Sequence, residues 1–377
     1  MAQLNLLDIG VEIPETKDPD DIITAPTKKR LVLPGDVWKL GEHFLMCGDA
    51  TKPEDLDRLL GGERPELLFT DPPYGMKKES DGVTNDNLNR QDLLQFNKTW
   101  LANALDVLAS NSSVYVWGMD ELLMDLYAFI VRPLILSRDL TFANLIVWDK
   151  AANFGQLSAD MRCYSNATEM CLFFYKGQQA YGRDCSTWYP PFQKFIDHMK
   201  EILDAGGLSI ADAVKITNTA TGHYFSHSQY QFPTEDAYIK ICQACGVKAE
   251  YEAVKAEHEA VKAEWYARRA YFDNTHDNMN NVWHFRRAAE VGEVDGHPTQ
   301  KPIKLCERGI LSSCREGGVV LDVFGGSGST LIAAENTKRR AYLLEIEPKW
   351  CELILDRFER KTNKEVRLFY RKGATHS

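Results

Sequence analysis

The sequence of 377 residues contains no apolar run that approaches the roughly 18 residues needed to cross a membrane. Its first residues lack both the basic start and the sustained apolar stretch of a secretory signal. The nine cysteines are odd in number and mostly lie in apolar runs, so reduced core thiols explain them better than a disulfide framework. We therefore expect a soluble cytoplasmic protein without a membrane partner.

Metal-ligand patterns are also scarce in the sequence. Cys242 and Cys245 have C-x-x-C spacing, but no second pair with zinc-ligand spacing follows them. The same spacing is about one helical turn, so packing on one face of a helix explains the pair as well. We expect no metal site.

The sequence has fewer basic than acidic residues. It contains 44 Lys and Arg and 54 Asp and Glu, which gives a formal net charge of -10. This balance argues weakly against a nucleic-acid partner, although a DNA-binding face needs no more than a local basic patch. Five basic clusters are candidates, and each alone is more often a solvated surface group. They are Lys28-Lys29-Arg30, Lys77-Lys78, Arg268-Arg269, Arg286-Arg287 and Lys338-Arg339-Arg340.

The distribution of apolar runs indicates an α/β protein with an interruption. Residues 1–30 form a polar arm with little to bury. Over 31–180 and again over 297–377, short apolar runs alternate with helical stretches, which is typical of a mostly parallel sheet. Residues 181–296 are aromatic, polar and mostly helical, so we predict one sheet domain assembled around an insertion. The predicted strands are 44–46, 67–70, 113–117, 145–148, 170–175, 319–323 and 341–345.

A heptad repeats three times within the insertion, over residues 250–270. It predicts a helix over 248–271, roughly 35 Å long. Three heptads are the lower limit for a coiled coil. Packing within its own domain and a dimer seam are both compatible with the pattern.

A rigid acidic turn, Asp71-Pro72-Pro73-Tyr74, directly follows the predicted strand 67–70. Ligands of open α/β sheets bind beyond the carboxyl ends of strands. Consecutive prolines stiffen the turn and leave carbonyls without competing N–H groups. The Asp71 carboxylate beside such a carbonyl suits acceptance of both hydrogens of an exocyclic amine, and Tyr74 offers a flat face for a base. A rigid turn at the sheet edge without a chemical role is the alternative.

A glycine-rich turn, FGGSGST over residues 324–330, joins the predicted strand 319–323 to a helix. The third glycine of a dinucleotide fingerprint is absent near Leu331, and there is no P-loop lysine. Glu345 closes the next strand, 17 residues after Gly328, where a carboxylate can bind the two hydroxyls of a ribose. The combination indicates a cofactor that contains a nucleoside and is bound without a phosphate-binding site.

Together these residues resemble the amino-methylating DNA methyltransferases. The F-x-G-x-G run within 324–328 is similar to that family's S-adenosylmethionine loop, and 71–74 to its catalytic motif. The catalytic motif precedes the insertion and the cofactor loop follows it, which resembles the beta group, a circular permutation of the usual methyltransferase sheet. The resemblance covers about 31–180 and 297–365, and the insertion occupies the place of that group's target-recognition domain.

Further matches extend the resemblance. Gly48-Asp49 resembles the acidic contact to the adenine of the cofactor. His297-Pro298-Thr299-Gln300-Lys301-Pro302 resembles the segment before the cofactor loop, which leads into a helix near the methionine moiety. Asn166-x-x-Glu169, with Trp148-Asp149-Lys150 before it, is similar to a less well-defined late motif.

The resemblance implies two sets of site residues. The implied catalytic residues are Asp71, Pro72, Pro73 and Tyr74. The implied cofactor-binding residues are Asp49, Asp71, Lys301, Phe324, Gly326, Ser327, Gly328, Thr330 and Glu345.

The fold implied is a circularly permuted Rossmann-like methyltransferase sheet with a mostly helical target-recognition insertion. The function implied is site-specific methylation of the adenine N6 amine in double-stranded DNA, by direct displacement from S-adenosylmethionine onto a flipped-out base. The resemblance implies that this function serves a bacterial or phage restriction–modification system. A homodimer is compatible with the same function. In the family that the sequence resembles, Asp rather than Ser at the start of the catalytic motif, here Asp71, favours adenine over cytosine as the methylated base. Cytosine-N4 methylation, methylation of an RNA base or a protein glutamine amide, and a catalytically silent DNA-binding subunit are the alternatives.

Sequence reading would then come from the insertion. Residues 209–214 begin like a capped helix, and 223–230 is rich in groups that contact base edges and phosphates. A helix-turn-helix and an ordinary polar surface helix both fit this pattern. The predicted DNA contacts are Ser226, Gln229, Arg268 and Arg286.

Overall fold

The computed structural model describes residues 21, 26–76, 84–137, 140–150, 164, 167–177, 192–218, 221–226, 230–267, 280–286 and 300–371. Most of the predicted polar arm, together with Gln229 and Arg268, lies outside these ranges. The chain divides into two compact units, residues 1–179 with 270–377 and residues 180–269. Within the described ranges, no helix is long and apolar enough to cross a membrane.

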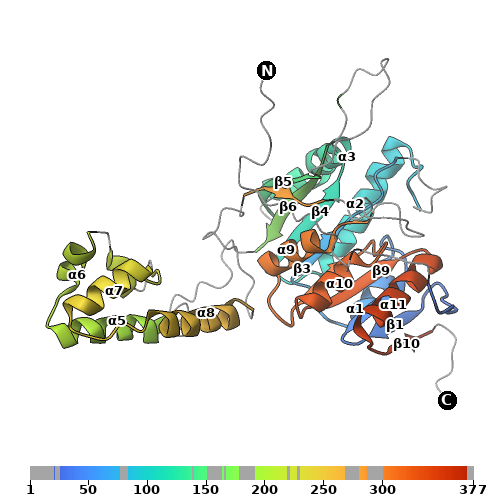
Figure 1. Cartoon of the computed structure of the whole chain (residues 1–377). Coiled ribbons are helices and arrows are strands. Elements are labelled where there is room, and N and C mark those ends of the chain that lie inside the picture. Colours follow the sequence, from blue (N-terminus) through green and yellow to red (C-terminus); the bar gives the residue numbers. More distant parts are fainter. Residues whose placement is uncertain are drawn as a thin grey trace, which may run out of the picture. The chain divides into compact units, whose positions relative to one another are not determined.

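The first unit is built on one sheet, which has 10 strands among the described residues (Figure 1). Their order across the sheet is β10-β1-β2-β9-β8-β3-β4-β6-β5-β7. The five central strands from β2 to β4 are parallel, while β1 and β6 run antiparallel to their neighbours. The bounds are β1 Val37–Leu40, β2 His43–Cys47, β3 Leu67–Thr70, β4 Ser112–Gly118, β5 Thr141–Asp149, β6 Thr168–Lys176, β7 Val282–His284, β8 Val319–Asp322, β9 Arg340–Glu345 and β10 Val366–Tyr370.

Both ends of the chain contribute to the centre of this sheet. β3 pairs in parallel with β8, with Leu68 opposite Leu321, and β2 pairs in parallel with β9. The strand that carries the glycine-rich turn therefore lies beside the strand that carries the acidic turn. The predicted α/β sheet, assembled from both ends of the chain around an insertion, is confirmed.

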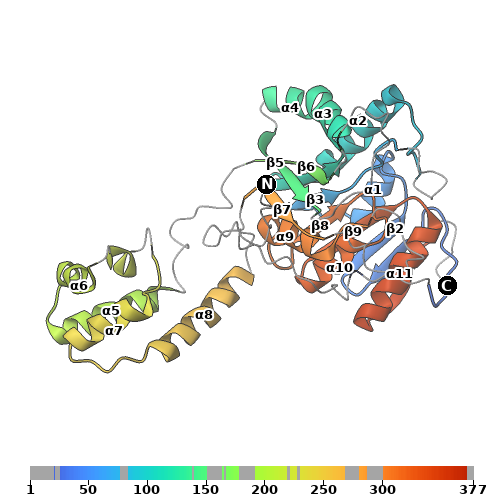
Figure 2. The ribbon, with the colours of Figure 1, turned by 45° about the horizontal axis from the view of Figure 1, so that its top comes forward.

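Helices cover both faces of the sheet. Because successive side chains of a strand point to opposite faces, neighbouring residues of β3 pack against different helices. Leu67 and Phe69 pack in one apolar cluster with α9, α10 and α11, whereas Leu68 packs in a second cluster with α1, α2 and α3. Figure 2 shows these two groups of helices on the two sides of the sheet. Helix α9 approaches the sheet closely, since a Cβ at Gly309 would lie 2.6 Å from the Phe69 ring. The bounds are α1 Pro53–Leu60, α2 Arg90–Val107, α3 Asp120–Leu126, η4 Tyr127–Val131, α4 Arg132–Leu136, α9 Ile303–Ser313, α10 Ser329–Asn336 and α11 Pro348–Thr362.

The second unit is helical and has a small apolar core of its own. Helix α6 begins with a capping box, in which Ser209 and Asp212 each accept a backbone N–H of the other. Cys242 and Cys245 are buried in the core, and no group of three metal-ligating side chains occurs among the described residues. The bounds are α5 Gln193–Gly206, α6 Ile210–Thr217, η6 Thr221–Phe225, α7 Glu235–Ala244 and α8 Tyr251–Ala267.

The boundary of the second unit lies at residue 269 rather than at the predicted 296. The cause is β7, a three-residue strand that pairs in parallel with β5. Trp283 on β7 is buried against Tyr115 and Trp117, so this segment belongs to the sheet core. A strand of three residues is too short to be recognised from apolar periodicity. Within the predicted helix 248–271, α8 begins at Tyr251, because residues 248–250 are not helical, and residues 268–271 lie outside the described ranges.

Candidate functional site

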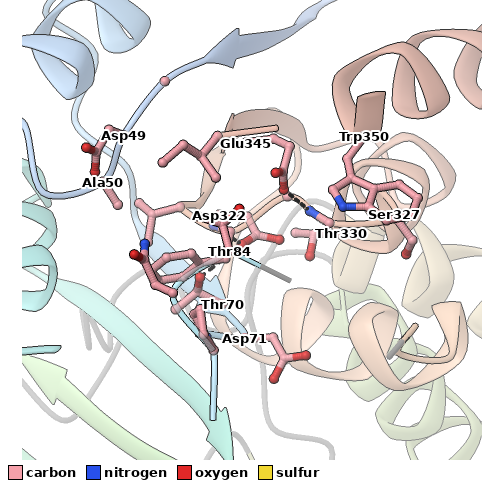
Figure 3. A pocket seen from close by; sticks show the side chains of 18 of the residues that line it. Asp49, Ala50, Thr70, Asp71, Thr84, Asp322, Ser327, Thr330, Glu345 and Trp350 are labelled. Atoms are coloured by element: carbon pink, nitrogen blue, oxygen red, sulfur yellow. Dashed lines mark hydrogen bonds between the residues drawn. The ribbon is translucent and has the colours of Figure 1, made fainter. Parts of the chain in front are cut away.

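A pocket opens where β2, β3, β8 and β9 end (Figure 3). Parallel strands bring their carboxyl ends to one edge of the sheet, so the four connecting turns converge there. All the predicted cofactor residues except Gly328 line this pocket. They are Asp49, Asp71, Lys301, Phe324, Gly326, Ser327, Thr330 and Glu345.

The glycine-rich turn shapes one wall of the pocket. Gly326 and Gly328 have φ angles of 50° and 79°, a region that side chains with a Cβ rarely adopt. Gly328 lies behind the wall, because a Cβ there would be 3.1 Å from the Ile354 side chain. The Phe324 ring packs edge-on against Trp100 at 5.2 Å between centroids, which fixes the start of the turn.

Glu345 is anchored at the end of β9. Its Oε2 accepts a hydrogen bond from the Gly326 backbone N–H at 2.7 Å, and its Oε1 accepts one from the Glu347 N–H at 2.9 Å. Burial raises the pKa of Glu345 to about 7, although these two donors oppose the shift. Each carboxylate oxygen keeps a further lone pair for a ligand hydroxyl.

Asp49 is the second acidic residue that was predicted from the sequence. It follows β2, which is the second strand of the chain because β1 precedes it. Its Oδ1 accepts hydrogen bonds from the Thr51 N–H at 2.9 Å and from the Thr51 hydroxyl at 2.7 Å. The side chain therefore shapes the turn at the pocket wall.

Sequence reasoning missed a third carboxyl group, Asp322 at the end of β8. It is buried, lines the pocket, and accepts hydrogen bonds from the Thr70 hydroxyl at 2.9 Å and the Phe324 N–H at 3.1 Å. Burial raises its pKa to about 7. A buried aspartate that ends a core strand beside a predicted cofactor turn was the available signal.

The charge of the pocket suits a positively charged nucleoside. Among the described residues, four carboxyl groups line it, and Lys301 is the one basic residue in that lining. This composition disfavours phosphate and favours a ligand that carries sulfonium and ammonium groups. The residues present therefore fit S-adenosylmethionine, with Glu345 facing hydroxyls and the glycine-rich turn allowing close backbone approach.

Asp71 and Tyr74 meet at the other end of the pocket in a hydrogen-bonded cluster. The Tyr74 hydroxyl donates to Asp71 Oδ1, and Lys301 Nζ donates to Asp71 Oδ2 at 2.5 Å. Lys301 thus contacts the catalytic motif, although the resemblance implied a cofactor contact. The cluster also includes Glu169, whose Oε1 lies 2.7 Å from the Tyr74 hydroxyl and 2.5 Å from Lys301 Nζ.

The acidic turn is fixed from behind by a residue that the sequence did not single out. Asp86 Oδ1 accepts hydrogen bonds from the backbone N–H groups of Tyr74 at 2.9 Å and Gly75 at 2.8 Å. Gly75 has a φ of 77°, which lets the chain turn immediately after Tyr74. Asp71 and Pro73 line the pocket, Pro72 is buried, and Tyr74 reaches the pocket through its hydrogen bond to Asp71.

The predicted DNA contacts are distributed over both units. Ser226 follows η6 in the second unit and is half-buried, while Arg286 follows β7 in the first unit and is exposed. Gln229 and Arg268 lie outside the described residues. DNA binding by these four side chains stays a prediction.

The sequence is similar to a family model and to several known proteins. A family model described as DNA methylase, N6_N4_Mtase, matches residues 66–356. Type II methyltransferase M.HpaI of Haemophilus parainfluenzae is 24% identical over 324 residues, which cover 85% of this chain and 76% of that protein. DNA adenine methyltransferase YhdJ of Escherichia coli (strain K12) is 39% identical over 80 residues, 21% of this chain and 27% of that one.

A solved structure also matches this chain. PvuII DNA methyltransferase, whose description specifies cytosine N4, is 13% identical and matches with a TM-score of 0.45. The match covers 87% of this chain and 95% of that chain.

Proposed function

Because the chain belongs to the N6/N4 DNA methylase family, it is a DNA methyltransferase that uses S-adenosylmethionine, and we propose that it methylates the N6 amine of adenine in double-stranded DNA. The observation that carries the proposal is the convergence of Asp71 and the glycine-rich turn on one pocket. Aspartate at the start of the motif and the similarity to an adenine methyltransferase support adenine.

The chemistry that we propose needs little from the protein beyond positioning. Exocyclic amines are poor nucleophiles because their lone pair is delocalised into the ring. When Asp71 accepts one amine N–H and the Pro72 carbonyl accepts the other, the nitrogen is drawn toward tetrahedral geometry and its lone pair is freed. S-Adenosylmethionine supplies a methyl group on a positively charged sulfur that is already activated for transfer. Alignment then provides much of the remaining acceleration.

Access to the amine requires that the base leave the duplex. A base within the stack cannot reach the recessed pocket, so we propose that it flips out and stacks on Tyr74. The second unit, residues 180–269, would read the surrounding sequence with Ser226, Gln229 and Arg268 as contacts, and Arg286 of the first unit would add a fourth contact. Homodimerisation through the heptads of α8 belongs to the same proposal.

Cytosine-N4 methylation is the second candidate, and the family model, which is named for both amines, favours keeping it. The two reactions use the same geometry on similar amines. A nucleoside analysis separates them.

The test is to incubate the protein with unmethylated genomic DNA and methyl-labelled S-adenosylmethionine, then digest the DNA and identify the labelled nucleoside by mass spectrometry. Asp71→Ala runs alongside. We expect label in N6-methyl-2′-deoxyadenosine with the native protein and none with the variant. Label in N4-methylcytosine would overturn the choice of base and keep the mechanism. Absence of label in DNA, despite measurable cofactor binding, would overturn the DNA substrate.

A further inference from the structure

Glu169 is the point where three hydrogen-bond donors of the catalytic cluster converge. Its Oε1 lies 2.7 Å from the Tyr74 hydroxyl, which shares its single proton between Glu169 and Asp71, and accepts from Lys301 Nζ at 2.5 Å. Its Oε2 accepts from Lys150 Nζ at 2.9 Å. Tyr74 and Lys301 are the two groups that hydrogen-bond the Asp71 carboxylate. Glu169 therefore contacts both partners of Asp71.

The strand pairing explains why these residues meet. Trp148 on β5 lies opposite Glu169 on β6 in an antiparallel register, so Lys150, two residues further, lies beside Glu169. The Lys150 backbone N–H bonds to the Ala167 carbonyl at 3.2 Å, which continues the ladder past the end of β5. Glu169 lies within β6, and Lys150 directly follows β5.

The cluster is buried and electrically balanced. The side chains of Lys150, Glu169 and Lys301 are 4%, 8% and 8% exposed. With Asp71, the cluster holds two carboxylates and two ammonium groups, so its formal charge is zero. Burial tends to raise the pKa of Glu169, but Lys301 and Lys150 outweigh it and lower that pKa to about 2. Glu169 is therefore an ionised acceptor at neutral pH.

We propose that Glu169 and Lys150 are positioning residues for methyl transfer. Lys150 holds the Glu169 carboxylate in place, and Glu169 in turn sets the direction of the Tyr74 hydroxyl and of Lys301 Nζ. These two groups fix the rotation of the Asp71 carboxylate. The inference rests on the proposed role of Asp71 as acceptor for the amine, and it assigns a task to the segment of Lys150 and Glu169 beyond core packing.

Misplacement of a reacting group by about 1 Å can cost roughly 100-fold in rate. We therefore expect Glu169→Gln, which keeps the size of the side chain and loses its charge, to lower the single-turnover rate by about 10- to 100-fold. The dissociation constant for S-adenosylmethionine should change less than about threefold, because Glu169 does not line the cofactor pocket. Lys150→Met should act in the same direction, and Lys150→Arg should restore most of the rate.

The pH profile distinguishes positioning from a purely structural role. Activity requires ionised Asp71, so the rate falls as the pH drops through the pKa of Asp71. The negative charge of Glu169 raises the pKa of Asp71. Glu169→Gln should therefore move the acid limb of the pH–rate profile to lower pH. Lys150→Met leaves the cluster with an excess negative charge and should move the limb to higher pH. The charged or titratable groups that face Asp71 are Tyr74, Glu169, Cys171, Lys301, Cys306 and Asp322.

The experiment measures single-turnover methylation of DNA, cofactor binding and thermal unfolding for these variants of the full chain. Glu335→Gln is the matched control, because Glu335 is also an ion-paired carboxylate with a pKa lowered to about 2, bonded to His43 and Lys364 away from the pocket. We expect its rate to equal that of the native protein. If Glu169→Gln does not fold, the double variant Glu169→Gln/Lys150→Met keeps the buried charge at zero and should still show the slow rate.

Native-like rates in Glu169→Gln or in the double variant would overturn the positioning role. A slow rate with an unshifted acid limb and a matching loss in Glu335→Gln would overturn it too, since general stability would explain both. Absence of DNA methylation by the native protein would instead overturn the proposed function, which is DNA methylation.

Discussion

The stability of the cofactor-free protein should depend on pH through the buried carboxyl of Glu345. Its pKa is raised from 4.5 to about 7 by burial. A group whose folded pKa is raised contributes stability that is fully present below its unfolded pKa and is lost as the pH rises through the folded pKa. The window is therefore about pH 4.5 to 7. A shift of about 2.5 units at 1.36 kcal/mol each corresponds to roughly 3 kcal/mol, an order-of-magnitude figure.

Glu345→Gln tests this reasoning, because the amide keeps the shape of the side chain and cannot ionise. Loss of one acceptor for the Gly326 or Glu347 N–H adds a cost that is the same at every pH. Urea unfolding of both proteins at pH 5 and pH 8, without cofactor, gives the difference in unfolding free energy. We expect the variant to gain about 2–3 kcal/mol relative to the native protein between these two pH values. An identical difference at both pH values would refute the argument.

The same variant should bind S-adenosylmethionine more weakly, since a carboxylate is the better acceptor for two hydroxyls. Calorimetric titration at pH 8 measures this. A variant with greater stability and weaker binding would show that the buried charge is maintained for the ligand at a cost to the fold.

Three further predictions follow from the cluster and from the two turns. Lys301→Met leaves two buried carboxylates without their shared cation and should lower the unfolding free energy by about 3–5 kcal/mol; a loss below about 1 kcal/mol in urea unfolding would contradict this. Gly328→Ala places a Cβ at a φ of 79°, 3.1 Å from Ile354, so the melting temperature should drop and cofactor affinity should fall at least about tenfold by titration. Asp86→Ala releases the Tyr74 N–H and should slow single-turnover methylation about tenfold or more, while unchanged turnover would argue against a role for this anchor.

Much of the central sheet could be predicted from the sequence because its strands are buried on both faces. Residues 67–70 were predicted as a strand from a continuous apolar run, and β3 has these bounds with all four residues buried. The edge strand β10 was missed for the opposite reason. β10 is half-exposed, with Phe369 55% accessible, and its sequence mixes charged and apolar residues without a clear period.

The candidate site was predictable where residues are adjacent in sequence and hidden where folding brings them together. The acidic turn and the glycine-rich turn are short runs, and both lie at the pocket. The contacts of Lys301 with Asp71 and Glu169 join three distant segments, and their distances follow from the strand order and from α9. No local pattern in the sequence encodes that geometry.

The most direct measurement of the central claim is the rate of methyl transfer in a single turnover, from preformed complexes of native protein and of Asp71→Asn with cofactor and DNA. Asparagine keeps the size of the side chain, while its NH₂ group cannot accept the amine hydrogen. We predict a rate at least about 100-fold lower, the scale of losing one transition-state hydrogen bond, with cofactor affinity within about threefold of native. A native rate in Asp71→Asn would contradict the assignment of the amine acceptor and the account built on it.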